Sequence, residues 1–112
     1  MKSTSTFPSP QVGSVGTFAD YPRWGIKGQA RILDERTINI ENFYLTGAEM
    51  PVEIRLQKDS RHVATLIDLT GQTFDDANFE LKLPESVDLG DFNVLTIFSP
   101  TLGAPLSGAA FD

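Results

Sequence analysis

The fold of this chain is decided by residues 26–42, which read IKGQARILDERTINIEN. In residues 26–32 small or apolar side chains alternate with polar ones, so that every second side chain points to the same face of an extended chain. The polar residues 34–36 (DER) are typical of a turn, and the alternation resumes after them with Ile38 and Ile40. Two alternating runs around a short polar turn predict an antiparallel β-hairpin.

The same period of two continues in both directions from this hairpin. Residues 52–57 alternate, residues 58–61 supply a turn, and the more fully apolar run 63–69 completes a second expected hairpin. Residues 79–83 alternate again until Pro84, which cannot donate to a strand ladder. Helical periodicity is weak throughout, including the one rival segment at residues 75–83.

The last third of the chain predicts two more strands. Residues 92–98 are apolar on both faces, which indicates a central strand covered on both sides. A loop follows at residues 101–105, and Ala109 and Phe111 indicate a final strand. Short strands at intervals of about ten residues are typical of an all-β protein. We therefore expect a two-sheet antiparallel β-sandwich of about eight short strands.

The length and the N-terminal composition predict the domain organisation. A chain of 112 residues has the size of one domain. Residues 1–15 lack periodicity and are rich in Ser, Thr and Pro, so they are expected to form an irregular or extended arm before a single domain at 16–112. Residues 1–10 lack the apolar run of a signal peptide or membrane anchor, so no membrane insertion is expected.

The charge and the missing cysteines exclude several function classes. There are 9 basic and 15 acidic residues, a net charge of −6, and the basic residues are scattered along the chain. This balance opposes binding to nucleic acid, which requires a basic stripe. With no cysteine, the chain has no disulfide, thiolate metal site or cysteine nucleophile.

His62 is the only histidine, and it lies beside Asp59, Ser60 and Arg61 in an expected turn. Together the serine, histidine and aspartate suggest a nucleophilic triad. The members of a triad normally come from separate elements, because neighbours in one turn cannot reach the required geometry. A solvated turn is the preferred interpretation, and no catalytic residue is predicted.

Acidic residues offer two further chemistries. Oxygen ligands for calcium could come from Asp34 with Glu35, Asp75 with Asp76, or Asp88 with Asp91. The spacing of a calcium loop is absent, and adjacent carboxylates in turns usually cap the backbone, so no metal site is predicted. A carboxylate pair for glycoside hydrolysis needs a separation of about 5 to 10 Å. Glu41 with Glu53 or Glu80 could provide one, although outward charges on strands look the same.

Two segments could form binding surfaces. Trp24, with Tyr21 and Arg23 nearby, could bind a sugar or peptide, but an aromatic residue between Pro22 and Gly25 more often covers the end of a core. Thr101 to Ser107 is uncharged and contains Gly and Pro, so it is either a recognition loop or a plain surface connection.

Several strings resemble the electron-transfer DM-thirteen domain. Residues 28–43 (GQARILDERTINIENF), followed by Gly47, are similar to its glycine-containing strand, short acidic turn and strand ending in I-x-N-F. Residues 83–84 (LP), 91–98 (DFNVLTIF) and 108–111 (GAAF) are similar to its second half. The resemblance covers residues 16–112.

This resemblance implies a β-sandwich found mostly in extracytoplasmic or surface-associated proteins. It also implies an electron-transfer role, which is assigned partly through a cysteine near the end of the domain. Ser99 stands at that position, and a serine cannot carry out thiol redox chemistry. A histidine that many members hold just before the first glycine strand is also absent, since residues 24–27 read WGIK.

Two functions from different classes follow from these observations. The preferred one is a non-catalytic binding or structural module that presents loops or a strand edge to a protein partner, as a subunit of a larger assembly would. The alternative is an electron-transfer domain with a redox centre such as haem, for which only His62, Met1 and Met50 could act as axial ligands. No cofactor is predicted. An enzyme built on carboxylates ranks third.

Overall fold

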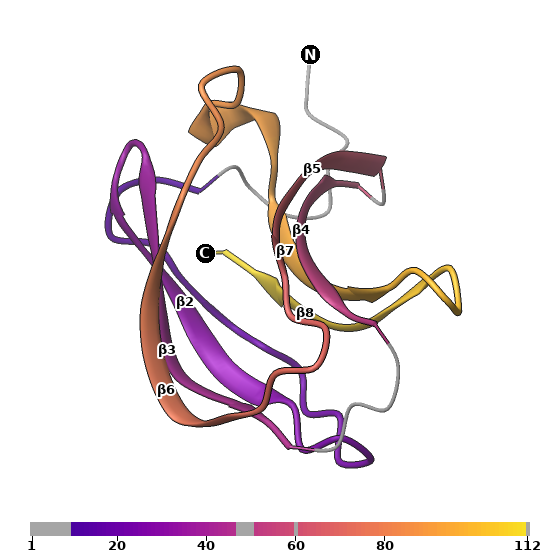
Figure 1. The fold of residues 1–112 in the computed structure, drawn as a ribbon. Helices are drawn as coiled ribbons and strands as arrows, with labels where there is room; N and C mark the ends of the chain where they lie inside the picture. The colour runs from indigo at the N-terminus through magenta and orange to yellow at the C-terminus, as the bar shows by residue number, and fades with distance from the viewer. Residues whose placement is uncertain (1–9, 47–50, 60, 112) are drawn as a thin grey trace.

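The computed structural model describes residues 10–46, 51–59 and 61–111, and within them eight strands form two antiparallel sheets (Figure 1). The first sheet has the order β1-β2-β3-β6. Its strands are β1 (Val15–Thr17), β2 (Lys27–Asp34), β3 (Thr37–Leu45) and β6 (Phe74–Lys82). The second sheet has the order β5-β4-β7-β8. Its strands are β4 (Glu53–Lys58), β5 (Arg61–Asp68), β7 (Val94–Ser99) and β8 (Ala104–Ala110).

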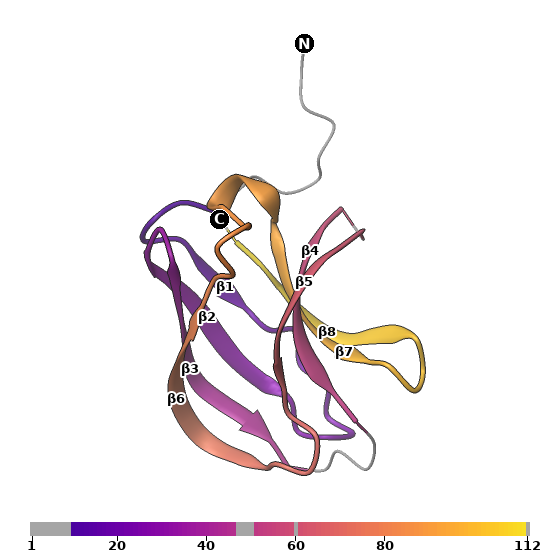
Figure 2. The same cartoon turned by 45° about the horizontal axis from the view of Figure 1, so that its top comes forward.

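The predicted two-sheet sandwich is confirmed, and the two sheets stand as separate layers in Figure 2. Both predicted hairpins form, because β2 pairs with β3 and β4 pairs with β5. The rival segment at residues 75–83 is a strand, and β6 ends at Lys82, before Pro84. A short 3₁₀ helix at Leu89–Asp91 lies in the connection between β6 and β7. The described residues contain no helix that is long and apolar enough to cross a membrane.

The strand at residues 92–98 is central, as predicted, since β7 lies between β4 and β8. Leu95 and Ile97 face the core and are fully buried. On the opposite face Phe98 is half-buried, with the Arg55 guanidinium carbon 3.8 Å from its ring centroid. A charged side chain therefore covers the outer face of this strand.

Several boundaries differ from the sequence prediction, and β6, for example, begins at Phe74 instead of Phe79. β7 begins at Val94 instead of Phe92. β8 begins at Ala104, inside the stretch expected to be a loop, because Ala104 pairs with Ser99 and Pro105 with Phe98 across a tight turn. β1 begins at Val15, the last residue assigned to the N-terminal arm. The remainder of that arm up to residue 9 lies outside the described residues.

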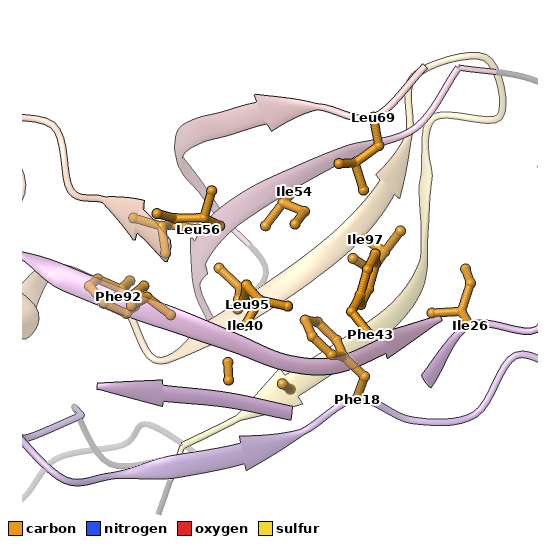
Figure 3. Packing of buried hydrophobic residues seen from close by; sticks show 14 of the residues in the cluster. Phe18, Ile26, Ile40, Phe43, Ile54, Leu56, Leu69, Phe92, Leu95 and Ile97 are labelled. Atoms are coloured by element: carbon orange, nitrogen blue, oxygen red, sulfur yellow. The ribbon is translucent and has the colours of Figure 1, made fainter. Parts of the chain in front are cut away.

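The core lies between the two sheets and consists of the inward side chains of both (Figure 3). Ile40 and Phe43 from β3 face Ile54 from β4 and Leu95 from β7, and all four are fully buried. Each side chain of this size contributes about 1.5–3 kcal/mol when it is fully removed from water. The apolar residues of the alternating sequence pattern are thus the residues that form the core.

One side of the sandwich is closed by backbone contacts between the sheets. The Ala19 amide donates to the Gly108 carbonyl at 3.1 Å, and β1 contacts β8. Gly16 permits this approach, since a Cβ atom there would lie 2.9 Å from the Ala110 carbonyl oxygen. On the other side β5 and β6 form the edges of different sheets, and they contact each other little.

Candidate functional site

His62 does not lie in a turn, as the sequence predicted, but within β5, because the turn from β4 is shorter than expected. Its Nε2 atom lies 3.1 Å from Thr65 Oγ1, and both residues are exposed. Asp59 is engaged elsewhere, since its Oδ1 accepts a hydrogen bond of 2.9 Å from Asn93 Nδ2. The described residues therefore place His62 and Asp59 in separate interactions.

Of the acidic pairs considered as calcium ligands, Asp34 and Asp91 cap the backbone, whereas Asp75 and Asp76 lie within β6. Asp34 Oδ1 accepts from the Arg36 amide at 2.8 Å, and this hydrogen bond, more than that of the Thr37 hydroxyl, lowers the pKa of Asp34. Asp91 Oδ2 accepts from the Asp88 amide at 2.8 Å. Within the described ranges no group of three or more histidines and carboxylates converges on one point.

Arg36 lines a hollow of about 360 Å³ together with Glu35, Asp88, Leu89 and Gly90. Its guanidinium makes four hydrogen bonds to the chain itself. It donates to the Val87 carbonyl at 2.7 Å, to Asp88 Oδ1 at 3.1 Å, and to two further carbonyls in the segment after β6. This arrangement holds the 3₁₀ segment against the β2–β3 turn, which gives Arg36 a structural role.

Of the possible glycosidase pairs, Glu41 and Glu53 are separated by the fold, whereas Glu41 and Glu80 lie on the neighbouring strands β3 and β6. Glu41 lies on β3 in the first sheet and Glu53 on β4 in the second, and each carboxylate pairs with an arginine of its own sheet. Arg31, and secondly Asn39, lower the pKa of Glu41 by hydrogen bonding. A general acid requires the opposite shift. Glu80 is exposed on β6, where it pairs in register with Asn39.

Trp24 covers the end of the core, which was the preferred interpretation. Only 5% of its surface is exposed, and its ring packs edge-on against Tyr21 with centroids 5.8 Å apart. The Thr46 amide donates to its carbonyl at 2.9 Å, which fixes the segment to the end of β3. The indole ring is therefore not available as a sugar-binding platform.

Of residues 101–107, only 101–103 lie in the β7–β8 turn and the rest belong to β8, and this hairpin extends away from the two sheets in Figure 2. Leu102 at its tip is 56% exposed. Ser99 is fully buried at the base, where its Oγ accepts from the Leu102 amide at 3.2 Å. Ser99 thus closes the turn.

The open side of the sandwich, formed by β5 and β6, is the principal candidate site. We call it the open flank. Its β6 edge carries three exposed carboxylates, Asp75, Asp76 and Glu80. Asp76 has a φ of 54° and accepts from Asn42 Nδ2 at 2.8 Å, so it also belongs to an irregular step in the β3–β6 ladder. Charges and irregularities of this kind protect an edge strand from unwanted pairing.

The β5 edge has no such charges between its ends. Residues 63–67 read VATLI, and within the described chain β5 pairs with β4 alone. The register pairs Leu56 with Ala64 and Gln57 with His62, which leaves Val63 as an extra residue. Leu66 is extra in the same way, so β5 contains two bulges, each with an apolar side chain.

Apolar side chains of both strands line the open flank. Val63, Leu66 and Ile67 on β5 are half-buried, as are Phe74 and Phe79 on β6. The two phenylalanine rings pack together with centroids 5.5 Å apart, and both contact the fully buried Phe43. An aromatic cluster therefore extends from the core to the surface between the two edges.

The sequence contains one signal for the open flank, which is the apolar run of β5. The run at residues 63–69 was more apolar than its neighbours, yet Val63, Leu66 and Ile67 remain half-buried. A strand apolar on both faces indicates either a central strand or an edge that is completed by another chain. Only the strand order, which places β5 at an edge, separates these alternatives.

A β-sandwich whose edge is uncharged and free has the architecture of a domain that could accept another strand. The chain belongs to the electron transfer DM13 family, since the model of that family matches residues 17–111. No curated protein and no solved structure matches the chain.

The family description implies a redox centre, for which the residues that the structure describes do not form a ligand set. A haem or an iron–sulfur cluster is held by His, Met or Cys side chains that converge on it. The chain has no cysteine, and its only imidazole is exposed on β5 beside Thr65. The two methionines lie outside the described residues.

Proposed function

We propose that this protein is a non-catalytic protein-binding module that accepts an extended segment of a partner as an additional strand at β5. The observation that carries the proposal is the contrast between the two edges of the open flank. The β6 edge is protected by carboxylates, whereas the β5 edge is uncharged from residue 62 to 67 with His62 neutral. Natural proteins protect free edges unless the edge is used.

Strand addition suits the chemistry of this edge. The backbone groups on the outer side of β5 supply hydrogen bonds that do not depend on the partner's sequence. The half-buried Val63 and Leu66 supply apolar contact that becomes complete only when a neighbour covers them. The proposed function thus requires only backbone groups and apolar side chains, and β5 has both.

The family assignment supports electron transfer as a second candidate function. It requires a redox group held by something other than cysteine ligands, because the chain has none. An absorption spectrum during titration with haemin tests it. A Soret shift lost in His62→Ala would favour this candidate, and a spectrum that equals free haemin would favour the binding module.

Selection from a random peptide library displayed on phage tests the binding module. We expect the selected peptides to have strand-forming sequences and to lose binding to Leu66→Lys, which places a charge on the edge. Leu33→Lys is the matched control, since Leu33 is 41% exposed on β2 in the other sheet. It should bind as the wild type does.

Circular dichroism verifies that each variant is folded. If Leu66→Lys is not folded, Val63→Lys carries the same charge at the other bulge of β5 and replaces it. Selected peptides that bind the edge variant as tightly as the wild type would show that β5 is not the site.

A further inference from the structure

We infer that the strand accepted at β5 is amphipathic, with uncharged apolar side chains at every second position, on the face that it turns toward the first sheet. This inference rests on the proposed function and names the chemistry of the partner. It follows from the core-facing side chains that the two edges of the open flank leave half-covered.

Two core-facing side chains of β6 are incompletely covered. The register pairs Phe79 with Ile40, which is fully buried. It pairs Phe74 with Leu45, which is fully buried as well. Residues directly opposite each other on paired strands point to the same face of the sheet, so both phenylalanines lie on the core face. Each is nevertheless only half-buried, because β6 is the last strand of its sheet on this side.

The core face of β5 has the same property. Ile67 pairs with Ile54, and Ala64 pairs with Leu56. Both β4 residues are fully buried, whereas Ile67 and Ala64 are half-buried. The core-facing side chains at the two edges of the open flank are therefore apolar on β5 and on β6 alike.

The carboxylate next to Phe79 lies on the opposite face of the first sheet. Glu80 pairs with Asn39, whose Nδ2 atom donates to Glu41 at 2.9 Å on that outer face. Successive side chains of a strand point to opposite faces, so Glu80 does not face the core side of the open flank. A charged side chain that the partner turned inward would lose hydration against apolar neighbours. The uncharged core side therefore matches an uncharged partner face.

The closed side of the sandwich shows how an edge is covered completely. Ala109 of β8 pairs with Leu95 on the core face and is fully buried. It lies close to Gly16 of β1, where a Cβ atom would be 3.2 Å from the Ala109 Cβ atom. The open flank has no such approach of β5 to β6, so its core-facing side chains require cover from another chain.

A strand paired with the free edge of β5 is in position to provide that cover. It continues the second sheet beyond β6, because β5 and β6 are the last strands of their sheets on this side. Packed sheets lie about 10 Å apart, and side chains of both fill the space between them. The inward side chains of the added strand therefore contact the uncovered parts of Phe74 and Phe79. Large apolar side chains suit these positions, since they remove the most apolar surface from water.

The outer face of β5 favours polar side chains at the remaining positions. Thr65 pairs with Arg55, and His62 pairs with Gln57. Thr65 Oγ1 donates to Glu53 Oε2 at 3.4 Å and lies 3.1 Å from His62 Nε2. Side chains that the partner turns outward extend this polar, solvent-exposed face. The two faces together define a partner strand in which apolar and polar residues alternate.

The β5 strand of a second copy does not offer this pattern. Its bulges at Val63 and Leu66 interrupt the alternation of apolar and polar residues. Its core-facing Ala64 and Ile67 are directed into their own sandwich. A flexible segment without bulges therefore fits the edge better than a second β5 does.

Three fluorescein-labelled peptides test the inference. Each has eight residues, the length of β5, between a lysine–glutamate pair at either end that keeps it neutral. Leucine alternates with threonine in the first, glutamine replaces leucine in the second, and the third has the composition of the first with its leucines in one block. We expect the alternating leucine peptide to bind at least about tenfold more tightly than either control by fluorescence polarisation. Its binding should be lost with Leu66→Lys.

Removing one ring from the core face of β6 provides the decisive comparison. Phe79→Ala should weaken the alternating leucine peptide about tenfold and leave the glutamine peptide unchanged. Tyr44→Ala is the matched control, since Tyr44 is a half-buried aromatic residue of the same sheet whose ring lies 4.8 Å from Lys27 Nζ. This variant should bind as the wild type does.

Circular dichroism verifies that both variants are folded. If Phe79→Ala is not folded, Ile67→Thr replaces it, because it makes the core face of β5 polar and keeps a residue that favours strands. Equal weakening in Phe79→Ala and Tyr44→Ala would overturn the inference, since it would show a loss of stability in place of a lost contact. Unchanged binding in a folded Phe79→Ala or Ile67→Thr variant would overturn it too.

The remaining outcomes separate the inference from the proposed function. If all three peptides bind equally and all are lost with Leu66→Lys, the inference is wrong and the proposed function stands. The same holds if peptides selected from the phage library bind at β5 without alternating apolar residues. If neither the designed peptides nor the library yields binding at β5, both are wrong. A dimer in sedimentation equilibrium that the alternating leucine peptide does not dissociate would identify a second copy as the occupant and overturn the inference.

Discussion

Ser99 has a structural role at the position where the family resemblance implies a redox cysteine. It occupies the position where the family resemblance implies a cysteine, and it is fully buried at the base of the β7–β8 hairpin. Its hydroxyl accepts from the Leu102 amide, and its carbonyl accepts from the Gly103 amide at 2.8 Å. The residue therefore contributes to the turn from a position that solvent does not reach.

Restoring the thiol at this position should not create a reactive group. In Ser99→Cys we expect the thiol to stay unreactive toward Ellman's reagent in the folded protein and to react after unfolding in guanidinium, because burial suppresses the thiolate. Thr101→Cys, two residues away and exposed, is the control and should react at once. A fast reaction of Cys at position 99 in the native protein would show that the base of the hairpin opens.

Residue roles were the hardest feature to predict from the sequence. The capping aspartates and the buried Trp24 were assigned correctly, because both follow from local turn chemistry and composition. The prediction that His62 lies in a turn was wrong, since Arg61 already pairs with Lys58 and His62 follows it within β5. The fourfold use of Arg36 could not be predicted, because its acceptors lie about fifty residues away in sequence.

At the scale of elements, irregular steps in the ladders shape the sandwich as much as the regular alternation does. Gly28 begins such a step in β2, with a φ of 145°. A Cβ atom there would lie 3.0 Å from the Phe43 Cα atom and 3.1 Å from the carbonyl oxygens of Glu41 and Asn42. Only glycine fits both the dihedral angle and the space.

Gly28→Ala should therefore destabilise the protein by about 1–3 kcal/mol, the usual range for a residue held in a disfavoured backbone region. Gly90→Ala is the matched control, since Gly90 has open space around its Cα atom and should change stability by less than about 0.5 kcal/mol. Guanidinium denaturation of both variants provides the comparison. Equal stability of the two would contradict the account of this step.

The elements themselves were predictable, and their order was not. Period two located β2, β3, β4 and β6, because a half-buried sheet requires that pattern, and more continuous apolar runs located β5 and β7. Which strands lie at the edges depends on long-range pairing, such as that of β3 with β6 and β4 with β7. The apolar run of β5 could therefore be recognised in the sequence, whereas its place at an edge could not.

For the molecule as a whole, the difference between the two sides of the sandwich leads to the proposed function. The side formed by β1 and β8 is closed by hydrogen bonds between the sheets. The opposite side, the open flank, combines an uncharged edge, an aromatic cluster and an acidic edge. Under the proposed function, a partner strand would add to the second sheet at β5 and cover the apolar side chains of the open flank.

Backbone amide hydrogen exchange of the protein with and without a peptide selected from the phage library tests the central claim most directly. In the free protein we expect alternate amides of β5 to exchange quickly, since the outer side of an edge strand has no partner, while those of β7 exchange slowly. Saturating peptide should slow the fast amides of Arg61–Asp68 by at least about tenfold and leave the β7–β8 turn unchanged. Protection that appears elsewhere, with β5 unaffected, would contradict the assignment of β5 as the binding edge.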